Sequence, residues 1–136
     1  MATQRIIAII GACSDKGVLA SKKLATGNTR LLLVDENRER LLLLKNEIQE
    51  KYSGADVEIM ECIKEAGWEA DIIVLALDWQ AEKEIFTMIK TFITGKTVIS
   101  FSKDNNCLLP YSKVIPLQED NTDWVNEMEV QLTNNF

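Results

Sequence analysis

A short apolar run that ends in a glycine loop constrains the fold of this chain more than any other feature. Residues Ile6 to Ile10 are all apolar, and the run stops at Gly11, where the small, polar stretch GACSDKG leads to Gly17. An apolar strand that leads into a glycine turn and then a helix commonly presents backbone N–H groups to a phosphate. We therefore expect a buried strand, a phosphate-binding loop and a helix that ends near Thr26.

Apolar segments of strand length alternate with segments of helical period along the chain. This alternation is typical of a parallel sheet covered on both faces. Right-handed crossovers then predict a doubly wound α/β fold with strand order 3-2-1-4-5 and room for a sixth strand at the edge. The strands are expected near Arg5 to Ile10, Arg30 to Val34, Val57 to Met60, Asp71 to Leu77, Thr97 to Phe101 and Lys113 to Pro116.

The helices are expected between these strands, with one apolar face each. Leu42 and Leu43 widen the apolar face of the second helix, which suggests a side covered by other residues or by a second subunit. Beyond the first helix, we expect helices at about Asn37 to Tyr52, Cys62 to Ala66 and Ala81 to Phe92. The predicted buried residues are Gly17, Ser21 and Leu24 in the first helix and Leu41, Leu44 and Ile48 in the second.

The size and charge of the chain exclude several classes of protein. Its 136 residues are enough for a single domain, residues 1–136, with a real core. The chain has 15 basic and 21 acidic residues, which gives a net charge of -6, and it contains no basic run. We therefore expect no nucleic-acid or membrane partner. The three cysteines, Cys13, Cys62 and Cys107, are far apart and no histidine is present. This pattern predicts a reduced, cytoplasmic protein without a metal site.

The glycine loop has two of the three glycines of a dinucleotide-binding fingerprint. Gly11 fits the tight turn after the strand, and Gly17 fits the position where helix meets sheet. Ser14 stands where a middle glycine is expected. Its side chain leaves the pyrophosphate less room to approach the backbone but adds a hydroxyl donor. Asp35 follows the second strand, where a carboxylate can accept a hydrogen bond from a ribose hydroxyl. The alternative is a tight turn in a fold that has lost its ligand.

Two residues of the loop have further interpretations. Cys13 lies near a helix N-terminus, which can activate a thiol, but a small residue that fills the loop explains it more simply. Asp15 could order water or a ribose, or could simply stabilise the start of the helix.

Three stretches resemble the NADP oxidoreductases that depend on the deazaflavin coenzyme F420, and also pyrroline-carboxylate-reductase-like domains. They are IAIIGACSDKG, ADIIVLALDWQAEKEI (Ala70 to Ile85) and GKTVISFSKDNN (Gly95 to Asn106), so the resemblance covers residues 5–106 and leaves 107–136 as a C-terminal strand and helix. It implies a Rossmann-like, NAD(P)-binding fold. It also implies that Gly11, Ala12, Cys13, Ser14 and Asp15 lie along the pyrophosphate and that Leu77, Asp78 and Trp79 border the nicotinamide.

The sequence differs from the family pattern at the edge of the sheet where the cofactor is expected to bind. Ser14 replaces a glycine, Asp78 replaces a proline, and Ser102 to Asp104 replace an asparagine-proline corner. Where NADP-preferring members have a serine-arginine pair, this chain has Asp35-Glu36-Asn37-Arg38, and a carboxylate repels a 2'-phosphate unless Arg38 or Arg40 turns toward it. We therefore expect NAD or NADP as cofactor, with NAD preferred.

Two classes of function remain open. In one, the chain is an oxidoreductase that transfers hydride between a nicotinamide cofactor and an unidentified acceptor, with catalytic residues unknown. In the other, it is a non-catalytic dinucleotide-binding or sensing module, or a Rossmann subunit that acts through a partner. About 30 residues follow the stretch that resembles the family, and we expect them not to include the segment that in the family completes a deazaflavin site. A C-terminal apolar stripe of Trp124, Met128 and Leu132 predicts a homodimer.

Overall fold

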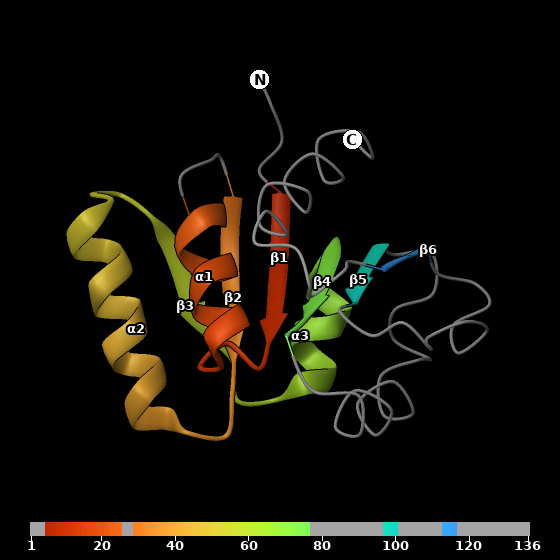
Figure 1. The fold of residues 1–136 in the computed structure, drawn as a ribbon, viewed down its shortest axis with the longest axis horizontal. Coiled ribbons are helices and arrows are strands. Elements are labelled where there is room, and N and C mark those ends of the chain that lie inside the picture. The colour runs from red at the N-terminus through yellow and green to blue at the C-terminus, as the bar shows by residue number, and fades with distance from the viewer. Residues whose placement is uncertain (1–4, 26–28, 77–96, 101–112, 117–136) are drawn as a thin grey trace.

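The computed structural model describes residues 5–25, 29–76, 97–100 and 113–116 (Figure 1). Strands and helices alternate from the first strand to the fourth, as the apolar pattern predicts. The strands are β1 (Arg5–Ile10), β2 (Thr29–Val34), β3 (Asp56–Ile59), β4 (Ile72–Leu75), β5 (Thr97–Ser100) and β6 (Lys113–Pro116), and the helices are α1 (Asp15–Leu24), α2 (Arg38–Lys51) and α3 (Ile63–Glu69). The predicted helix at Ala81 to Phe92 and the stripe of Trp124, Met128 and Leu132 lie outside the described residues.

The six strands form one parallel sheet in the order β3-β2-β1-β4-β5-β6. The predicted order is therefore confirmed, and β6 occupies the sixth, edge position. The direction of winding reverses between β1 and β4. In sheets of this kind, ligands bind outside the carboxyl ends of the strands at such a reversal, so the fold places the glycine loop at the expected binding edge.

Two apolar clusters cover the two faces of the sheet. Ile7 and Ile9 of β1 belong to the cluster that packs against α1 and α2, whereas Ala8 and Ile10 belong to the cluster that packs against α3. Successive strand residues point to opposite faces, so a strand covered on both sides is apolar throughout. The buried faces predicted for α1 and α2 are confirmed, with Gly17, Ser21, Leu24, Leu41, Leu44 and Ile48 all buried.

The third helix differs from its prediction. It covers Ile63–Glu69 rather than Cys62 to Ala66, so it continues through Gly67 and Trp68. Glycine is a poor helix former, but Ala66 and Gly67 are both buried. Close packing of these small residues against the sheet outweighs the low helix propensity of glycine.

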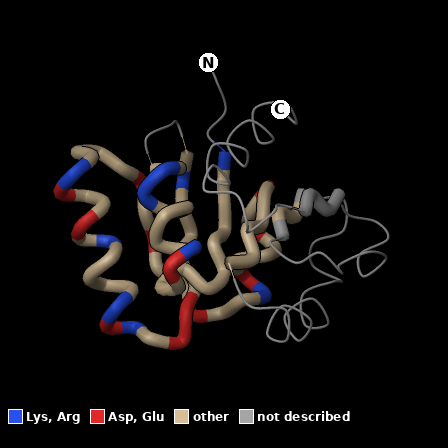
Figure 2. The backbone as a smooth tube through the Cα atoms, in the orientation of Figure 1, with Lys and Arg blue, Asp and Glu red and all other residues tan. Residues whose placement is uncertain are grey.

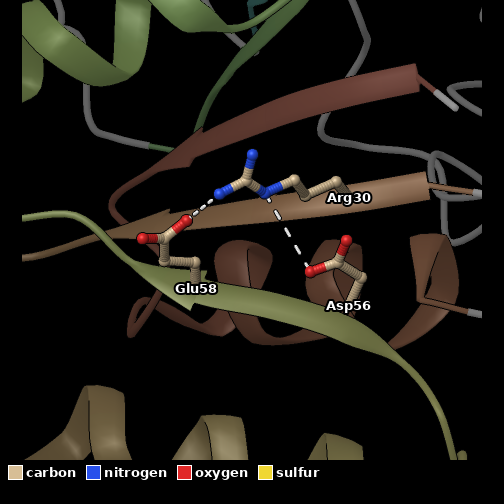
Figure 3. Close-up of polar contacts among 3 residues, drawn as sticks. All are labelled: Arg30, Asp56 and Glu58. Carbon is tan, nitrogen blue, oxygen red and sulfur yellow. Dashed lines mark hydrogen bonds and ion pairs between the residues drawn. The ribbon is translucent and has the colours of Figure 1, made fainter.

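An ionic cluster joins β2 to β3 on the sheet face that α3 covers. Arg30 forms an ion pair with Glu58, and its Nε lies 4.0 Å from Oδ1 of Asp56 (Figure 3). Arg30 and Asp56 are also register partners in the parallel pairing. Because all three side chains are partly exposed, the cluster adds modest stability and helps to fix the register of the edge strand.

Candidate functional site

The glycine loop turns back on the end of β2 directly after β1. Gly11 has a φ of 83°, a left-handed conformation that glycine adopts without strain. Its N–H and that of Ala12 both donate to the carbonyl oxygen of Val34, at 2.8 and 3.1 Å. The loop is thus fixed at the carboxyl edge of the sheet, between β1 and the residues that follow β2.

Gly17 lies where α1 meets the loop, and there is no space for a side chain. A Cβ atom at this position would lie 2.1 Å from the carbonyl oxygen of Gly11 and 2.7 Å from Cα of Ala12. The neighbouring atoms are backbone atoms, so they cannot move aside as a flexible side chain would. Gly17 was predicted to lie where helix meets sheet; the atoms nearest to the added Cβ belong instead to the backbone of the loop, at Gly11 and Ala12.

Ser14 caps the N-terminus of α1. Its Oγ accepts a hydrogen bond from the Gly17 N–H at 3.0 Å and lies 2.7 Å from the carbonyl oxygen of Gly11 and 2.8 Å from that of Ala76. A hydroxyl has one proton, which here goes to one of these two carbonyls. The hydroxyl therefore connects the loop to the end of β4, and its use as a donor to a ligand stays a prediction.

Asp35 lies beside the loop, and each of its carboxylate oxygens accepts one backbone hydrogen bond. Oδ2 accepts from the Cys13 N–H at 3.0 Å, and Oδ1 accepts from the Asn37 N–H at 3.0 Å. Asn37 in turn caps α2 by accepting from the Arg40 N–H at 3.1 Å. Each oxygen keeps further acceptor capacity, so the carboxylate is oriented by the protein and can still accept a hydrogen bond from a hydroxyl group.

The Cys13 thiol is a packing group in this arrangement. It is partly buried against the core, and Sγ lies 3.9 Å from the carbonyl oxygen of Asn37. Burial raises the pKa of the thiol, the negative charge of Asp35 and a hydrogen bond with Asp35 raise it further, and Arg40 opposes them. A raised pKa disfavours the thiolate, which agrees with the simpler interpretation of Cys13 as a small residue that fills the loop.

The loop and Asp35 together fit the ribose and pyrophosphate part of a dinucleotide. The N–H groups of residues 11–14 are bonded within the protein, while that of Asp15, the first residue of α1, has no acceptor in the described part of the chain. Amides at a helix N-terminus, with the partial positive charge of the helix dipole, are suited to a phosphate. The Asp15 side chain is exposed. Leu77, Asp78 and Trp79, predicted to border the nicotinamide, lie outside the described residues.

Arg38 is exposed and forms an ion pair with Glu61, which follows β3. Glu61 is not among the residues predicted from the sequence. The available signal was its position: β2 and β3 are parallel neighbours, so residues just after each strand meet at one edge of the sheet. In Figure 2, both acidic and basic segments lie along this edge. The ion pair therefore brings two residues that are distant in sequence together beside Asp35.

The described residues include no group of three histidine, cysteine or carboxylate side chains that could hold a metal ion. Among the helices that the structure describes, none is long and apolar enough to cross a membrane.

The sequence matches the family described as NADP oxidoreductase coenzyme F420-dependent over residues 6–104. The chain belongs to this family. The match covers β1 through β5 and includes the glycine loop, so the resemblance predicted from the three sequence stretches is confirmed. No curated protein matches the sequence significantly.

Solved structures with a similar fold include enzymes of several kinds. A 6-phospho-beta glucosidase from Thermotoga maritima, with NAD and glucose-6-phosphate, has a TM-score of 0.68 at 13% identity; the match covers 93% of this chain and 42% of that one. A 3-hydroxyacyl-CoA dehydrogenase from Archaeoglobus fulgidus has a TM-score of 0.69 at 15% identity, with 96% and 54% covered. A lactate dehydrogenase from Cryptosporidium parvum has a TM-score of 0.58 at 13% identity, with 76% and 39% covered.

These likenesses confirm the Rossmann-type fold of this member of the F420-dependent NADP oxidoreductase family. At such low identity they establish the fold alone. This chain spans only about two-fifths of the length of the glucosidase chain. A glycosidase and dehydrogenases share the fold, so the reaction must be argued from the site rather than from the architecture.

Proposed function

We propose that this chain binds a nicotinamide dinucleotide at the glycine loop and acts as an oxidoreductase on an unidentified acceptor. The observation that carries the proposal is the close contact of Gly17 with Gly11 and Ala12, which places the start of α1 directly against the loop. Family membership supports the same assignment. A bound nicotinamide ring would supply the hydride, and the protein would bind and orient it.

Each described residue of the loop has a part in this proposal. The pyrophosphate would lie against the backbone from Gly11 to Asp15 and interact with the start of α1. Asp35 would accept a hydrogen bond from a hydroxyl of the adenine ribose, since its carboxylate is already held by the Cys13 and Asn37 amides. The nicotinamide half would lie toward Leu77, Asp78 and Trp79.

We infer a preference for NAD over NADP from the charges beside the ribose. Asp35 is fixed in place and carries a negative charge, and Glu36 follows it on the exposed side of the chain. A 2'-phosphate would have to approach these carboxylates, whereas a 2'-hydroxyl can donate to one of them. NADH is therefore expected to bind at least several-fold more tightly than NADPH.

A second candidate is a binding or sensing module without catalysis, or a subunit that acts through a partner. The described part of the site supports it, because the groups around the loop bind and orient but include no histidine or activated thiol for proton transfer. The oxidoreductase would oxidise NADH repeatedly, whereas the binding module would not. Oxidation of NADH by the purified chain with F420 or FMN as acceptor supports the enzyme, and dinucleotide binding without turnover supports the module.

A homodimer in the cytoplasm completes the proposal. Leu42 and Leu43 on α2 are 46% and 64% exposed, which is unusual for neighbouring leucines and favours contact with a second copy. The cytoplasmic location is proposed from the sequence, in which Cys13, Cys62 and Cys107 are far apart and form no C-x-x-C pair.

The proposed function is tested by calorimetric titration of the full chain with NADH and NADPH. Asp35→Ser should remove the preference for NADH. Asp71→Ser is the matched control, because Asp71 also accepts a backbone N–H, that of Ile6, but lies just before β4, at the opposite end of the strands. No binding of either dinucleotide to the folded wild type would refute the proposal. Tighter binding of NADPH would refute the NAD preference alone.

A further inference from the structure

The ion pair between Arg38 and Glu61 lies at the edge of the sheet where the ribose is proposed to bind. Arg38 is the first residue of α2 and follows Asp35 by three positions. Its Nη1 contacts Oε1 of Glu61, a residue in the connection between β3 and α3. The parallel pairing of Leu33 with Ile59, and the hydrogen bond from the Met60 N–H to the Leu33 carbonyl oxygen, bring these two connections together.

An arginine just after the second strand is suited to bind a 2'-phosphate on the adenine ribose. In this chain, that guanidinium already has a carboxylate partner. To bind the phosphate, Arg38 would have to leave Glu61, and the released carboxylate would add its negative charge to those of Asp35 and Glu36. The pair therefore opposes NADP(H) twice, through competition for Arg38 and through repulsion of the phosphate.

We propose that Glu61 is a specificity-determining residue, which keeps Arg38 paired and so disfavours dinucleotides that carry a 2'-phosphate. The inference rests on the proposed dinucleotide site and adds to it a residue outside the glycine loop. Glu61 acts through Arg38 rather than by contact with the cofactor. NADH has no 2'-phosphate, so its affinity does not depend on the pair.

Exposure limits the size of the effect. The Arg38 and Glu61 side chains are 65% and 74% exposed, and ion pairs of this kind are screened by water and salt. Release of Arg38 should therefore raise the affinity for NADPH by roughly two- to fivefold, with little change for NADH. The gain should shrink as ionic strength rises.

Arg40 is another cation near this edge. Its backbone N–H donates to Asn37, its side chain is exposed, and no ion pair with it occurs in the described part of the chain. If Arg40 alone contacted the phosphate, the state of the Arg38 pair would not matter. The experiment must therefore show that the effect of Glu61 requires Arg38.

The test is a double-mutant cycle on the full chain, with dissociation constants for NADPH and NADH measured by fluorescence titration. Glu61→Gln should strengthen NADPH binding by roughly two- to fivefold, and most of the gain should disappear when Arg38→Ala is also present. Glu39→Gln is the charge-matched control, because it removes an exposed carboxylate from the first turn of α2 that has no ion pair with Arg38 in the described residues.

Three results would overturn the inference while leaving the dinucleotide site intact. They are an unchanged NADPH to NADH ratio in Glu61→Gln, a gain of undiminished size in the Arg38→Ala background, and an equal gain from Glu39→Gln. The last two would show an effect of net charge rather than release of Arg38. Absence of NADH and NADPH binding in the wild type would instead refute the proposed function, so the two failures are distinguishable.

Discussion

Replacement of Gly17 by alanine sets two opposing effects against each other. Alanine is the better helix former, and the exchange in an unconstrained helix would stabilise the protein by about 1 kcal/mol. At Gly17, however, the new Cβ would lie 2.1 Å from the Gly11 carbonyl oxygen, and ordinary contact begins at 3.4 Å. The start of α1 would have to move away from the loop by more than about 1 Å.

The cost of that movement can be estimated from what α1 contacts. Overpacking of a rigid site costs about 3 kcal/mol, and loss of the Ser14 cap, whose Oγ accepts from the Gly17 N–H at 3.0 Å, costs about 1 kcal/mol more. After the gain in helix propensity, we expect a net loss of about 3 kcal/mol. For a domain of 136 residues this lowers the melting temperature by roughly 10 °C.

Thermal and urea unfolding followed by circular dichroism measure this loss, and Gly54→Ala is the control. Gly54 has a φ of +87°, and a Cβ added there would have no atom within 4 Å, so alanine meets backbone strain of about 1 to 2 kcal/mol without crowding. Gly17→Ala should also weaken NADH binding, while Gly54→Ala should not. A Gly17→Ala variant as stable as the wild type, or more stable, would refute the steric argument.

Three further predictions concern other parts of the chain. The pKa of the Cys13 thiol is raised by burial and by Asp35, so this thiol should react with iodoacetamide more slowly than the exposed thiol of Cys62. Because the unfolded chain releases the thiol proton at a lower pH than the folded chain does, the free energy of unfolding should fall as pH rises through 9.0. Cys13→Ala should remove that part of the fall. Arg30→Met leaves Glu58 without its cation and should cost about 1 kcal/mol in urea unfolding, less at high salt; a salt-independent loss would contradict an ionic role. Leu43→Glu should convert the proposed dimer into a 15.4 kDa monomer by light scattering, and a dimer that survives it would place the interface elsewhere.

The strand pattern was readable from the sequence because the central strands β1, β2 and β4 are apolar and mostly buried on both faces. Arg5–Ile10 and Lys113–Pro116 agree with their predictions at both ends, and the strand order follows from handed crossovers. The bounds of α3 were less predictable. Gly67 looked like the end of a helix by local preference, and only its burial against the sheet explains why the helix continues.

In the glycine loop, too, some features could be predicted from the sequence and others could not. Gly11, Gly17 and Asp35 could be selected from sequence because a tight turn, a close contact and a carboxylate after the second strand each require a particular residue type. The bonding of Ser14 could not, because its hydroxyl reaches Ala76, which is 62 residues away in sequence. Its use within the protein depends on β1 and β4 being neighbours.

The sequence by itself determined the fold class, the strand order and the position of the loop, because these follow from apolar period, glycine placement and the handedness of the chain. Tertiary structure decided which polar groups are used within the protein and which remain open to a ligand. Arg38 illustrates the reason: its charge is plain in the sequence, but its partner, Glu61, reaches it only because β2 and β3 end side by side.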